Sequence, residues 1–234
     1  MNQEKNLPRV LVGCPTADYK AYCLPAYVDA VKKLSYPCYD ILLVDNSKGS
    51  SYAQQIKNLG IPVLKGPWFE GALQRIIHSR NLLREYALAH NYDYFFSLEQ
   101  DVIPPKNILE KLLAHKKKVI SAVYFTHNLI DGKQQLIPLA YKLLDKKNLS
   151  MRPLNDEELW KHPGLMHIVS AGLGAVLIHR DILEKVKFRF ERDVFDDRFF
   201  FKDLYALKQE VWCDSSIKCK HLITRPIPWS QIKK

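Results

Sequence analysis

The sequence predicts an α/β fold with a mostly parallel central sheet and helices on both faces of that sheet. Short apolar runs without polar alternation recur along the chain, which is typical of parallel strands buried on both faces. Segments with the helical spacing of apolar residues separate these runs, and such alternation favours a doubly wound sheet. A chain of 234 residues can form one such sheet, so we expect a single domain over residues 1–234.

Strands and helices alternate through the first hundred residues. The first helical segment places Leu24, Val28 and Val31 on one face and tolerates Pro25 in its first turn. Pro62 restricts the third strand to a sheet edge or a strand start, because proline lacks a backbone N–H. The expected strands cover residues 10–14, 41–44, 61–64 and 94–98, and the later helices cover residues 50–59 and 71–90.

The second half of the chain is less regular. A helix over residues 106–116 and a strand over residues 119–124 are followed by polar, proline-interrupted sequence from residue 126 to about 166. Long irregular connections in a domain are usually functional or disordered. Strand character returns at residues 175–178, Asp181 is expected to cap a short helix that ends at Val186, and a short strand covers residues 210–213.

Composition indicates a cytoplasmic protein. The chain is 47% hydrophobic and 26% charged, which is an ordinary globular balance. No apolar stretch approaches the roughly 20 residues of a membrane span, and the N-terminus lacks the apolar segment of a signal peptide. The five cysteines form no CxxC pair, so we expect reduced thiols; the sequence gives no support for a disulfide between Cys213 and Cys219.

The net charge of +10 needs a partner or another explanation. The tail, residues 223–234, is basic and contains Arg225, Lys233 and Lys234 among prolines and a tryptophan. Such a tail can steer phosphorylated ligands or contact an anionic membrane peripherally, or it can be a basic terminus without a role. Basic residues elsewhere are scattered and aromatics lie mainly in apolar runs, so we expect no nucleic-acid partner.

The triplet Glu99-Gln100-Asp101 is the strongest candidate site in the sequence. It closes a buried strand and is followed by Val102, Ile103 and two prolines. Carboxylates beside a core are costly unless a cation meets them, and a divalent metal with a phosphorylated ligand is one such cation. Thr16 and Asp45 also follow strands, and ligands of open parallel sheets gather beyond the carboxyl ends of the strands. These residues therefore predict a pocket at one sheet edge.

An ordered set of short motifs resembles the GT-A fold glycosyltransferases that use nucleotide sugars, closest to the family 2 type. The resemblance covers roughly residues 9–222. It rests on Pro15-Thr16, Asp45-Asn46-Ser47, Ser79-Arg80-Asn81, the acidic triplet in place of Asp-x-Asp, Ala171 to Ala175, Asp196 to Phe200, and His221. It implies a small antiparallel part on the acceptor side, a nucleotide-sugar-binding half over about residues 9–125 and an acceptor and catalytic half over about residues 126–222.

The resemblance implies a Mn²⁺ or Mg²⁺ ion that stabilises the departing nucleoside diphosphate of a UDP- or GDP-sugar. It assigns the metal to Asp101 and His221, with Glu99 as a further ligand. Because Glu99 is one methylene longer than the family's aspartate, contacts with ribose or a metal-bound water are the alternatives. Carboxylates suit either ion, and an imidazole shifts the preference toward Mn²⁺. An ordinary polar loop at residues 99–101 and a satisfied or surface histidine at position 221 are the structural alternatives.

The resemblance also distributes the donor contacts. It implies that Asp45 accepts a hydrogen bond from the base or ribose, that Thr16 lines the same pocket and that Arg80 meets the base or a phosphate. The alternatives are an Asx turn at Asp45 and a solvated arginine on an amphipathic helix. Gly172 and Gly174 either let the backbone approach the sugar or permit a tight turn. The full donor set is Pro15, Thr16, Asp45, Arg80, Glu99, Gln100, Gly172 and Gly174.

The catalytic candidates are Asp196 and Asp197. With a helix starting at Arg198, Asp196 is expected to be the N-cap, while Asp197 matches the family's acid that deprotonates the acceptor hydroxyl, which gives an inverting reaction. Two capping acids are the structural alternative. We expect contacts with a glycan, lipid-linked or protein acceptor in residues 126–166, including Trp160, because aromatic faces stack on sugar rings.

Two other function classes compete with an enzyme of this kind. A nucleotidyltransferase would share the sheet and the metal, but the sequence lacks a glycine-rich phosphate loop after the first strand. A catalytically inactive nucleotide-sugar-binding or anionic-surface-binding protein of the same fold is the other class. It is motivated by Glu99, by the missing glutamate before Asp197 and by the net charge.

Overall fold

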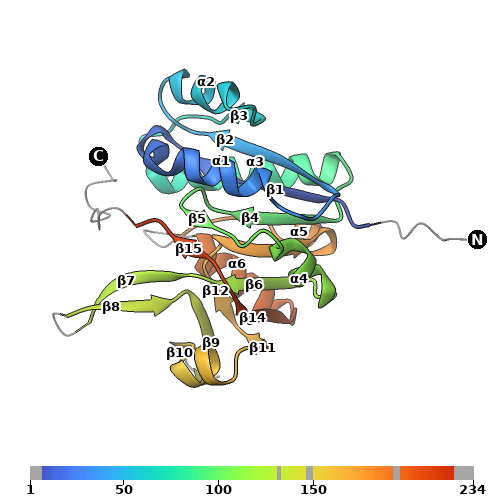
Figure 1. Cartoon of the computed structure of the whole chain (residues 1–234), viewed down its shortest axis with the longest axis vertical. Coiled ribbons are helices and arrows are strands. Elements are labelled where there is room, and N and C mark those ends of the chain that lie inside the picture. The colour runs from blue at the N-terminus through green and yellow to red at the C-terminus, as the bar shows by residue number, and fades with distance from the viewer. Residues whose placement is uncertain (1–6, 131–132, 146–149, 192–195, 224–234) are drawn as a thin grey trace, which may run out of the picture.

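The computed structural model describes residues 7–130, 133–145, 150–191 and 196–223 (Figure 1). Within these residues the main sheet has eight strands in the order β11-β14-β6-β13-β4-β1-β2-β3. Six of them run in one direction, while β13 and β11 run antiparallel to their neighbours. The sheet is therefore mostly parallel, as the sequence predicts.

The strands of the main sheet match the apolar runs closely. The short edge strand β3 begins at Val63, so Ile61 and Pro62 lie outside it. The bounds are β1 Val10–Thr16, β2 Tyr39–Asp45, β3 Val63–Lys65, β4 Tyr94–Leu98, β6 Val119–Val123, β11 Leu165–Ile168, β13 Ala175–His179 and β14 Val211–Lys218.

Helices cover both faces of the sheet. Alternate residues of β1 separate the two cores, since Val10 and Val12 pack with α1, α2 and α4 while Leu11 packs with α3, α5 and α6. The bounds are η1 Asp18–Cys23, α1 Leu24–Lys32, α2 Ser51–Asn58, α3 Ala72–Ala89, α4 Ile108–Ala114, η2 Glu157–Lys161, α5 Arg180–Lys185 and α6 Asp196–Ala206.

The region that sequence analysis left irregular is largely β-structure. The hairpin β7 Phe125–Ile130 and β8 Lys133–Pro138 projects beyond the sheet at the left of Figure 1. A second small sheet consists of β9 Ala140–Asp145, β10 Ser150–Pro153 and β12 Ser170–Ala171. The expectation of irregular chain over residues 126–166 was wrong because hairpin strands exposed to solvent need no continuous apolar run.

Two helix starts differ from the expectation. His179, not Asp181, caps α5, because its ring nitrogen Nδ1 accepts a 3.2 Å hydrogen bond from the backbone N of Asp181. Helix α6 begins at Asp196, two residues earlier than expected, so Asp196 lies inside its first turn and is not the N-cap. Both adjacent acids therefore belong to the helix.

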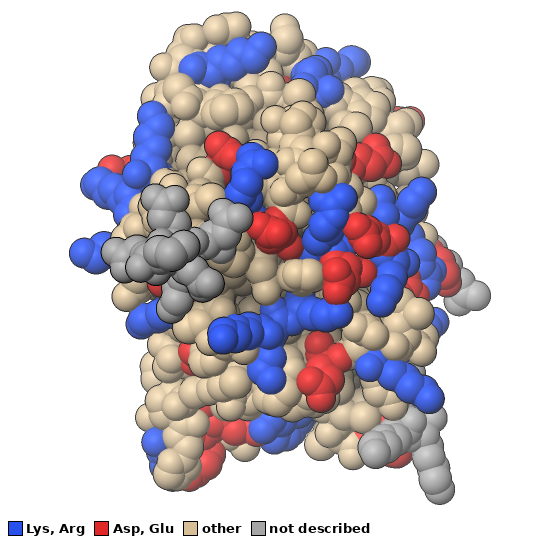
Figure 2. All heavy atoms as spheres, turned by 90° about the vertical axis from the view of Figure 1, so that its right-hand side faces the viewer, with Lys and Arg blue, Asp and Glu red and all other residues tan. Residues whose placement is uncertain are grey.

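The surface at the amino ends of the strands carries mixed charge. Figure 2 shows basic and acidic side chains interspersed on this face. Exposed ion pairs of the protein include Arg9–Asp40 and Lys118–Asp181. The basic tail that motivates membrane contact lies outside the described residues from residue 224 onward. No helix in the described part of the chain combines the length and apolar character needed to cross a bilayer. All five cysteines are free thiols.

Candidate functional site

The candidate site lies at the carboxyl ends of β1, β2 and β4. Thr16 and Asp45 are direct partners in the parallel β1–β2 register, so they lie side by side at this edge. The triplet that follows β4 turns sharply, because the backbone N of Val102 donates to the carbonyl of Glu99 at 2.8 Å. The turn brings Asp101 back over the strand ends, where its side chain is only 8% exposed.

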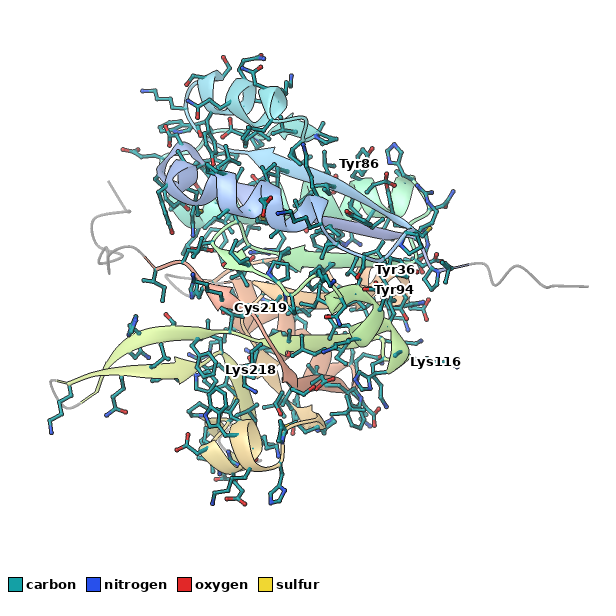
Figure 3. The ribbon with its side chains drawn as sticks, viewed as in Figure 1. Tyr36, Tyr86, Tyr94, Lys116, Lys218 and Cys219 are labelled. Carbon is teal, nitrogen blue, oxygen red and sulfur yellow. The ribbon has the colours of Figure 1, made fainter. Side chains whose placement is uncertain are left out.

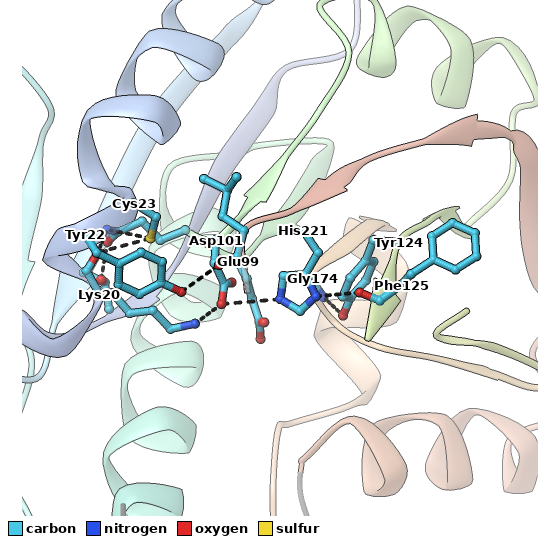
Figure 4. A network of polar contacts seen from close by, with 12 residues as sticks. Lys20, Tyr22, Cys23, Glu99, Asp101, Tyr124, Phe125, Gly174 and His221 are labelled. Carbon is cyan, nitrogen blue, oxygen red and sulfur yellow. Dashed lines mark hydrogen bonds and ion pairs between the residues drawn. The ribbon is translucent and has the colours of Figure 1, made fainter. Parts of the chain in front are cut away.

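Two basic side chains meet the Asp101 carboxylate. Figure 4 shows Lys20 and His221 reaching it from opposite sides. The ammonium of Lys20 donates to Oδ2 of Asp101, and Nε2 of His221 lies 3.4 Å from the same oxygen. Burial raises the pKa of Asp101, but His221 and Lys20 outweigh that effect and hold the pKa below its usual range. Asp101 is therefore ionised throughout the neutral range.

The backbone places His221 opposite Asp101. The short strands β15 Lys220–His221 and β5 Val102–Ile103 pair antiparallel, with His221 opposite Val102. The next backbone N, of Leu222, donates to the carbonyl of Asp101 at 2.7 Å. This bridge brings together two residues that are 120 positions apart in the sequence.

A carbonyl group sets the tautomer of His221. Its Nδ1 lies 2.7 Å from the carbonyl oxygen of Phe125, and because that oxygen can only accept, Nδ1 carries the proton. Nε2 then donates to Asp101 when the ring is protonated and offers a lone pair when it is neutral. Burial lowers the pKa of His221, but the contact with Asp101 raises it to a net value above the ordinary one. A second contact of this kind is the usual way to orient a metal-ligating histidine.

The donor set at Asp101 fits a divalent metal that takes further ligands from a diphosphate. Oδ1 of Asp101 is buried and has no hydrogen-bond partner among the residues that the structure describes. Two ligands of an octahedral Mg²⁺ at about 2.1 Å lie about 3 Å apart, close to the 3.4 Å between Nε2 of His221 and Oδ2 of Asp101. No cluster of three or more His, Cys, Asp or Glu side chains occurs in the described part of the chain. Substrate oxygens would thus have to complete the coordination, as is usual for Mg²⁺.

Glu99 lies beside Asp101 and contacts a buried arginine. Its side chain is 35% exposed, and Oε1 lies 3.3 Å from an amino group of Arg80. Its backbone N donates to the carbonyl of Gly174 at 3.1 Å. In Figure 4 the Glu99 carboxylate lies beside Asp101 with no dashed line to Lys20 or His221. Glu99 thus presents a carboxylate next to Asp101 and His221 without an ion pair to Lys20 or His221.

Arg80 is one of the largest fully buried side chains of the protein. Its Nε donates to Asp196 at 2.7 Å, one amino group donates to Ser97 at 2.7 Å and the other approaches Glu99. The alternative of a solvated arginine on the α3 surface was therefore wrong. Protein groups occupy the guanidinium, so its position favours an internal link between α3, β4 and α6.

The two acids at the start of α6 have different surroundings. Asp196 is 3% exposed and accepts the Arg80 hydrogen bond. Asp197 is partly exposed, and one of its oxygens accepts from the backbone N of Arg198 at 2.6 Å. Burial, followed by the negative charge of Asp196, raises the pKa of Asp197 to about 6. Of the two catalytic candidates, Asp197 is the more accessible, and its pKa is raised toward neutrality.

Asp45, which was expected at the base or ribose, is engaged with neighbouring protein groups. Asp45 is fully buried; Oδ1 accepts from the backbone N and hydroxyl of Ser47 at 2.9 and 2.5 Å, and Oδ2 accepts from Lys65 at 3.0 Å. The Asx turn at Asp45 is thus present. A base that bonds to Asp45 has to approach through Lys65, whose side chain is 37% exposed.

Gln100 braces the β1 end of the site. It is 1% exposed and contacts the hydroxyl of Thr16, the Tyr52 hydroxyl at 2.9 Å and the carbonyl of Lys20 at 2.8 Å. Pro15 precedes Thr16 in β1 and is partly buried. Gln100 and Thr16 therefore hold the loop that carries Lys20 against β1.

The two glycines of the second half make room for Tyr124. A Cβ on Gly172 would lie 2.2 Å from the Tyr124 hydroxyl, and one on Gly174 would lie 2.7 Å from the same oxygen. The chain does turn at Leu173 and Gly174, as the alternative expects. Neither glycine has a positive φ angle, so the close approach of Tyr124, not a left-handed backbone, is what requires glycine here. The backbone N of Gly174 donates to the Tyr124 hydroxyl at 3.0 Å, and the Tyr124 ring meets His221 edge-on at 5.3 Å.

An exposed aromatic side chain lies on the His221 side of the candidate site. Trp160 is 56% exposed and stacks on Phe125 with ring centroids 6.0 Å apart and a 5° angle between the planes. The ammonium of Lys218 lies 4.4 Å from the centroid of the Trp160 ring. Lys218 is labelled in Figure 3, on the side of the sheet where β9 and η2 pack. Phe125 also supplies the carbonyl that contacts Nδ1 of His221. The platform formed by Trp160 and Phe125 therefore adjoins the pair Asp101 and His221.

Sequence analysis missed Lys20, Lys65 and Tyr124. Lys20 lies four residues after the first strand end, and the need of Asp101 for a cation was the signal that could have found it. Lys65 ends β3 next to Asp45 in the parallel register. No sequence pattern marks Tyr124, whose importance arises from its contact with two glycines far along the chain.

Comparisons with known proteins agree with this architecture. No protein-family profile and no curated protein sequence matches the chain. Among solved structures, GalNAc-T7, solved with UDP, GalNAc and Mn²⁺, is 16% identical over 93% of this chain and 44% of its own, with a TM-score of 0.66. TarS of S. aureus is 13% identical over 91% of this chain and 35% of its own, with a TM-score of 0.56. A197 from STIV is 17% identical over 91% and 85%, with a TM-score of 0.52.

These likenesses show the fold. The chain has a GT-A-like glycosyltransferase fold, as the ordered motifs of the sequence predict. It spans less than half the length of GalNAc-T7 and of TarS.

Proposed function

We propose that this protein is a metal-dependent glycosyltransferase that moves a sugar from a nucleoside-diphosphate donor to an acceptor hydroxyl with inversion. The fold supports a transferase at the level of architecture. The observation that carries the proposal is the pair Asp101 and His221. Oδ1 of Asp101 has no hydrogen-bond partner in the described part of the chain, and Nε2 of His221 faces the same carboxylate. UDP- and GDP-sugars are the proposed donors, and Mn²⁺ or Mg²⁺ is the proposed ion.

Asp101 and His221 would hold the metal beside the donor diphosphate. The chemistry that such an ion supplies when bound is Lewis-acid stabilisation of the leaving diphosphate. The carbonyl of Phe125 keeps the proton on Nδ1 of His221, so Nε2 is the nitrogen available to the ion. Glu99, partly exposed beside Asp101, is the candidate for ribose or for a metal-bound water.

Asp197 is the proposed general base. A base that removes the acceptor proton should be ionised near neutral pH yet retain affinity for a proton. The carboxylate of Asp197 meets this requirement because burial and the charge of Asp196 raise its pKa to about 6. Asp196 is held by Arg80 and keeps the start of α6 in place, so it acts as a positioning residue.

The acceptor is proposed to lie against the platform of Trp160 and Phe125. The Trp160 ring is exposed and parallel to Phe125, which suits stacking on a sugar ring. A Trp160→Ala variant should raise the KM for an acceptor sugar and leave donor binding unchanged. Unchanged kinetics with every acceptor that is turned over would remove Trp160 from the acceptor site. The acceptor class remains a glycan, a lipid-linked sugar or a protein.

Thermal unfolding with UDP-, GDP- and CMP-sugars, with and without Mn²⁺, tests the donor half of the proposal. A ligand that binds only the folded protein raises its Tm. We expect a metal-dependent increase with a UDP- or GDP-linked donor, and its loss in Asp101→Asn. An equal increase in Asp101→Asn would contradict the metal site.

A non-catalytic nucleotide-sugar-binding protein is the competing class. The lysine on Asp101 favours it, because in the structure a protein cation already occupies the carboxylate. Binding of a donor without any release of nucleoside diphosphate, in the presence of Mn²⁺ and acceptors, would support this class over an enzyme.

A further inference from the structure

We propose that Lys20 is a resident cation of the donor site, which opposes binding of a free divalent ion at Asp101 and makes the site select a metal–diphosphate complex. This inference rests on the proposed function, because it concerns the same metal and the same donor. It assigns a role to a residue that lies outside the motifs shared with glycosyltransferases.

Hydrogen bonds hold the backbone of Lys20 in place, whereas its side chain has one ionic partner among the described residues. Its backbone N donates to Ala17 at 2.8 Å, and its carbonyl accepts from Gln100 at 2.8 Å and from the thiol of Cys23 at 3.1 Å. Among the described residues, the ion pair of its ammonium is with Asp101. The side chain can therefore change position while η1 stays in place.

Burial makes this ion pair electrostatically important. The Lys20 and Asp101 side chains are 21% and 8% exposed, so water screens the pair weakly. The ammonium of Lys20 donates directly to Oδ2 of Asp101, so the two opposite charges are in contact. Asp101 is thus already neutralised when a metal ion arrives, and His221 adds a second basic group at the same oxygen.

A free divalent ion and a nucleotide-bound ion meet this arrangement differently. The free ion must share Asp101 with an ammonium or displace it, and two cations a few ångströms apart repel strongly at low dielectric. A nucleoside diphosphate brings negative charge with the ion and offers acceptors to the displaced ammonium. Lys20 therefore penalises the free ion more than the complex.

Isothermal titration of Mn²⁺ alone tests the inference, without any enzymatic readout. We expect weak binding to the wild type and a Kd lower by about tenfold or more in Lys20→Gln. Lys20→Arg keeps the charge and should bind Mn²⁺ as weakly as the wild type. Lys33→Gln, which removes an exposed lysine paired with Asp29 within α1 and its C-terminal turn, is the matched control and should change nothing.

The outcomes separate this inference from the proposed function. Tighter Mn²⁺ binding in Lys20→Gln, lost again in Lys20→Gln/Asp101→Asn, supports the inference even if no donor is turned over. An unchanged or weaker Mn²⁺ affinity in Lys20→Gln overturns it, even if the protein is an active transferase. If Lys20→Gln does not fold, Lys20→Arg still tests the inference. Mn²⁺ binding to Lys20→Arg that is tenfold tighter than to the wild type would contradict a role that depends on the charge of Lys20.

Discussion

Asp197 shows how the position of one carboxylate shapes the proposed chemistry. Its raised pKa arises from burial and from Asp196, whose own charge is balanced by Arg80. A catalytic base of this kind costs stability, because the folded protein holds an ionised carboxylate where it is poorly solvated. Two predictions at the residue scale follow from this cost.

The pH profile of kcat/KM should rise through about pH 6 and then level off. Asp197 accepts a proton only when ionised, and its pKa of about 6 lies above the ordinary value of 3.8. Below pH 6 the rate should fall about tenfold per pH unit. Initial rates between pH 5 and 8 measure this, and a profile that is flat across that range would exclude Asp197 as the base.

Asp197→Asn should lose activity by about 100-fold or more and yet gain thermal stability. Because the folded-state pKa is raised, ionisation of Asp197 destabilises the protein above about pH 6, and this cost disappears as the pH falls toward 4. The increase in Tm should therefore be largest at pH 8 and vanish near pH 4. A lower Tm at pH 8 would instead indicate a structural role for the carboxylate.

At the scale of elements, Arg80 links α3 and β4 to α6. Its side chain is buried, and its guanidinium meets Ser97 and Asp196. Arg80→Met should lower the free energy of unfolding by about 3–5 kcal/mol, because it leaves Asp196 buried without a partner. Urea denaturation measures this.

The matched variant for Arg80 removes both charges. Arg80→Met/Asp196→Leu should be more stable than Arg80→Met alone, since no unpaired buried charge remains. If the double variant is as unstable as the sum of the single variants, the ion pair is not the link between these elements.

Tyr124 and the segment that contains Gly172 form a second link between elements. Gly172→Ala should lower stability by about 1–3 kcal/mol, because the new Cβ would overlap the Tyr124 hydroxyl. Tyr124→Phe removes that oxygen and should recover part of the loss in the double variant. Chemical denaturation of the four proteins gives the coupling, and strict additivity would show that Tyr124 is not the obstacle.

Sequence analysis predicted the elements of the sheet better than their connections. The strands β1, β2, β4 and β6 are marked by unbroken apolar runs, so their positions follow from burial on both faces. The antiparallel insertion of β13 between β4 and β6 has no such signal, since a buried strand looks the same in either direction. The resemblance implied a small antiparallel part in the second half of the chain, and it is present. The sequence of β7 and β8 has no continuous apolar run, so it does not mark the strands of this hairpin.

The residues of the candidate site likewise differ in how far the sequence predicts them. Asp45, Asp101 and Asp197 are prominent in sequence because each carboxylate adjoins an apolar segment. Their partners Lys20 and Lys65 are inconspicuous among 35 lysines and arginines and become visible only through the register and loops that bring them to the acids. Ion pairs over long sequence separations depend on tertiary structure, which local patterns do not encode.

At the scale of the whole molecule, one continuous sheet joins the proposed donor and acceptor halves. Strands β4 and β13 pair directly, and β4 carries the triplet while β13 follows the glycine segment. We therefore predict one cooperative unfolding transition for the chain. Far-ultraviolet circular dichroism and tryptophan fluorescence should give the same midpoint; two separate midpoints would show that the halves unfold independently.

The most direct test of the central claim is the release of nucleoside diphosphate from a panel of UDP- and GDP-sugars with Mn²⁺. The proposed function predicts release from at least one donor in the wild type, and loss of that release in both Asp101→Asn and Asp197→Asn. Absence of turnover with every donor, or equal turnover in the wild type and Asp101→Asn, would contradict it.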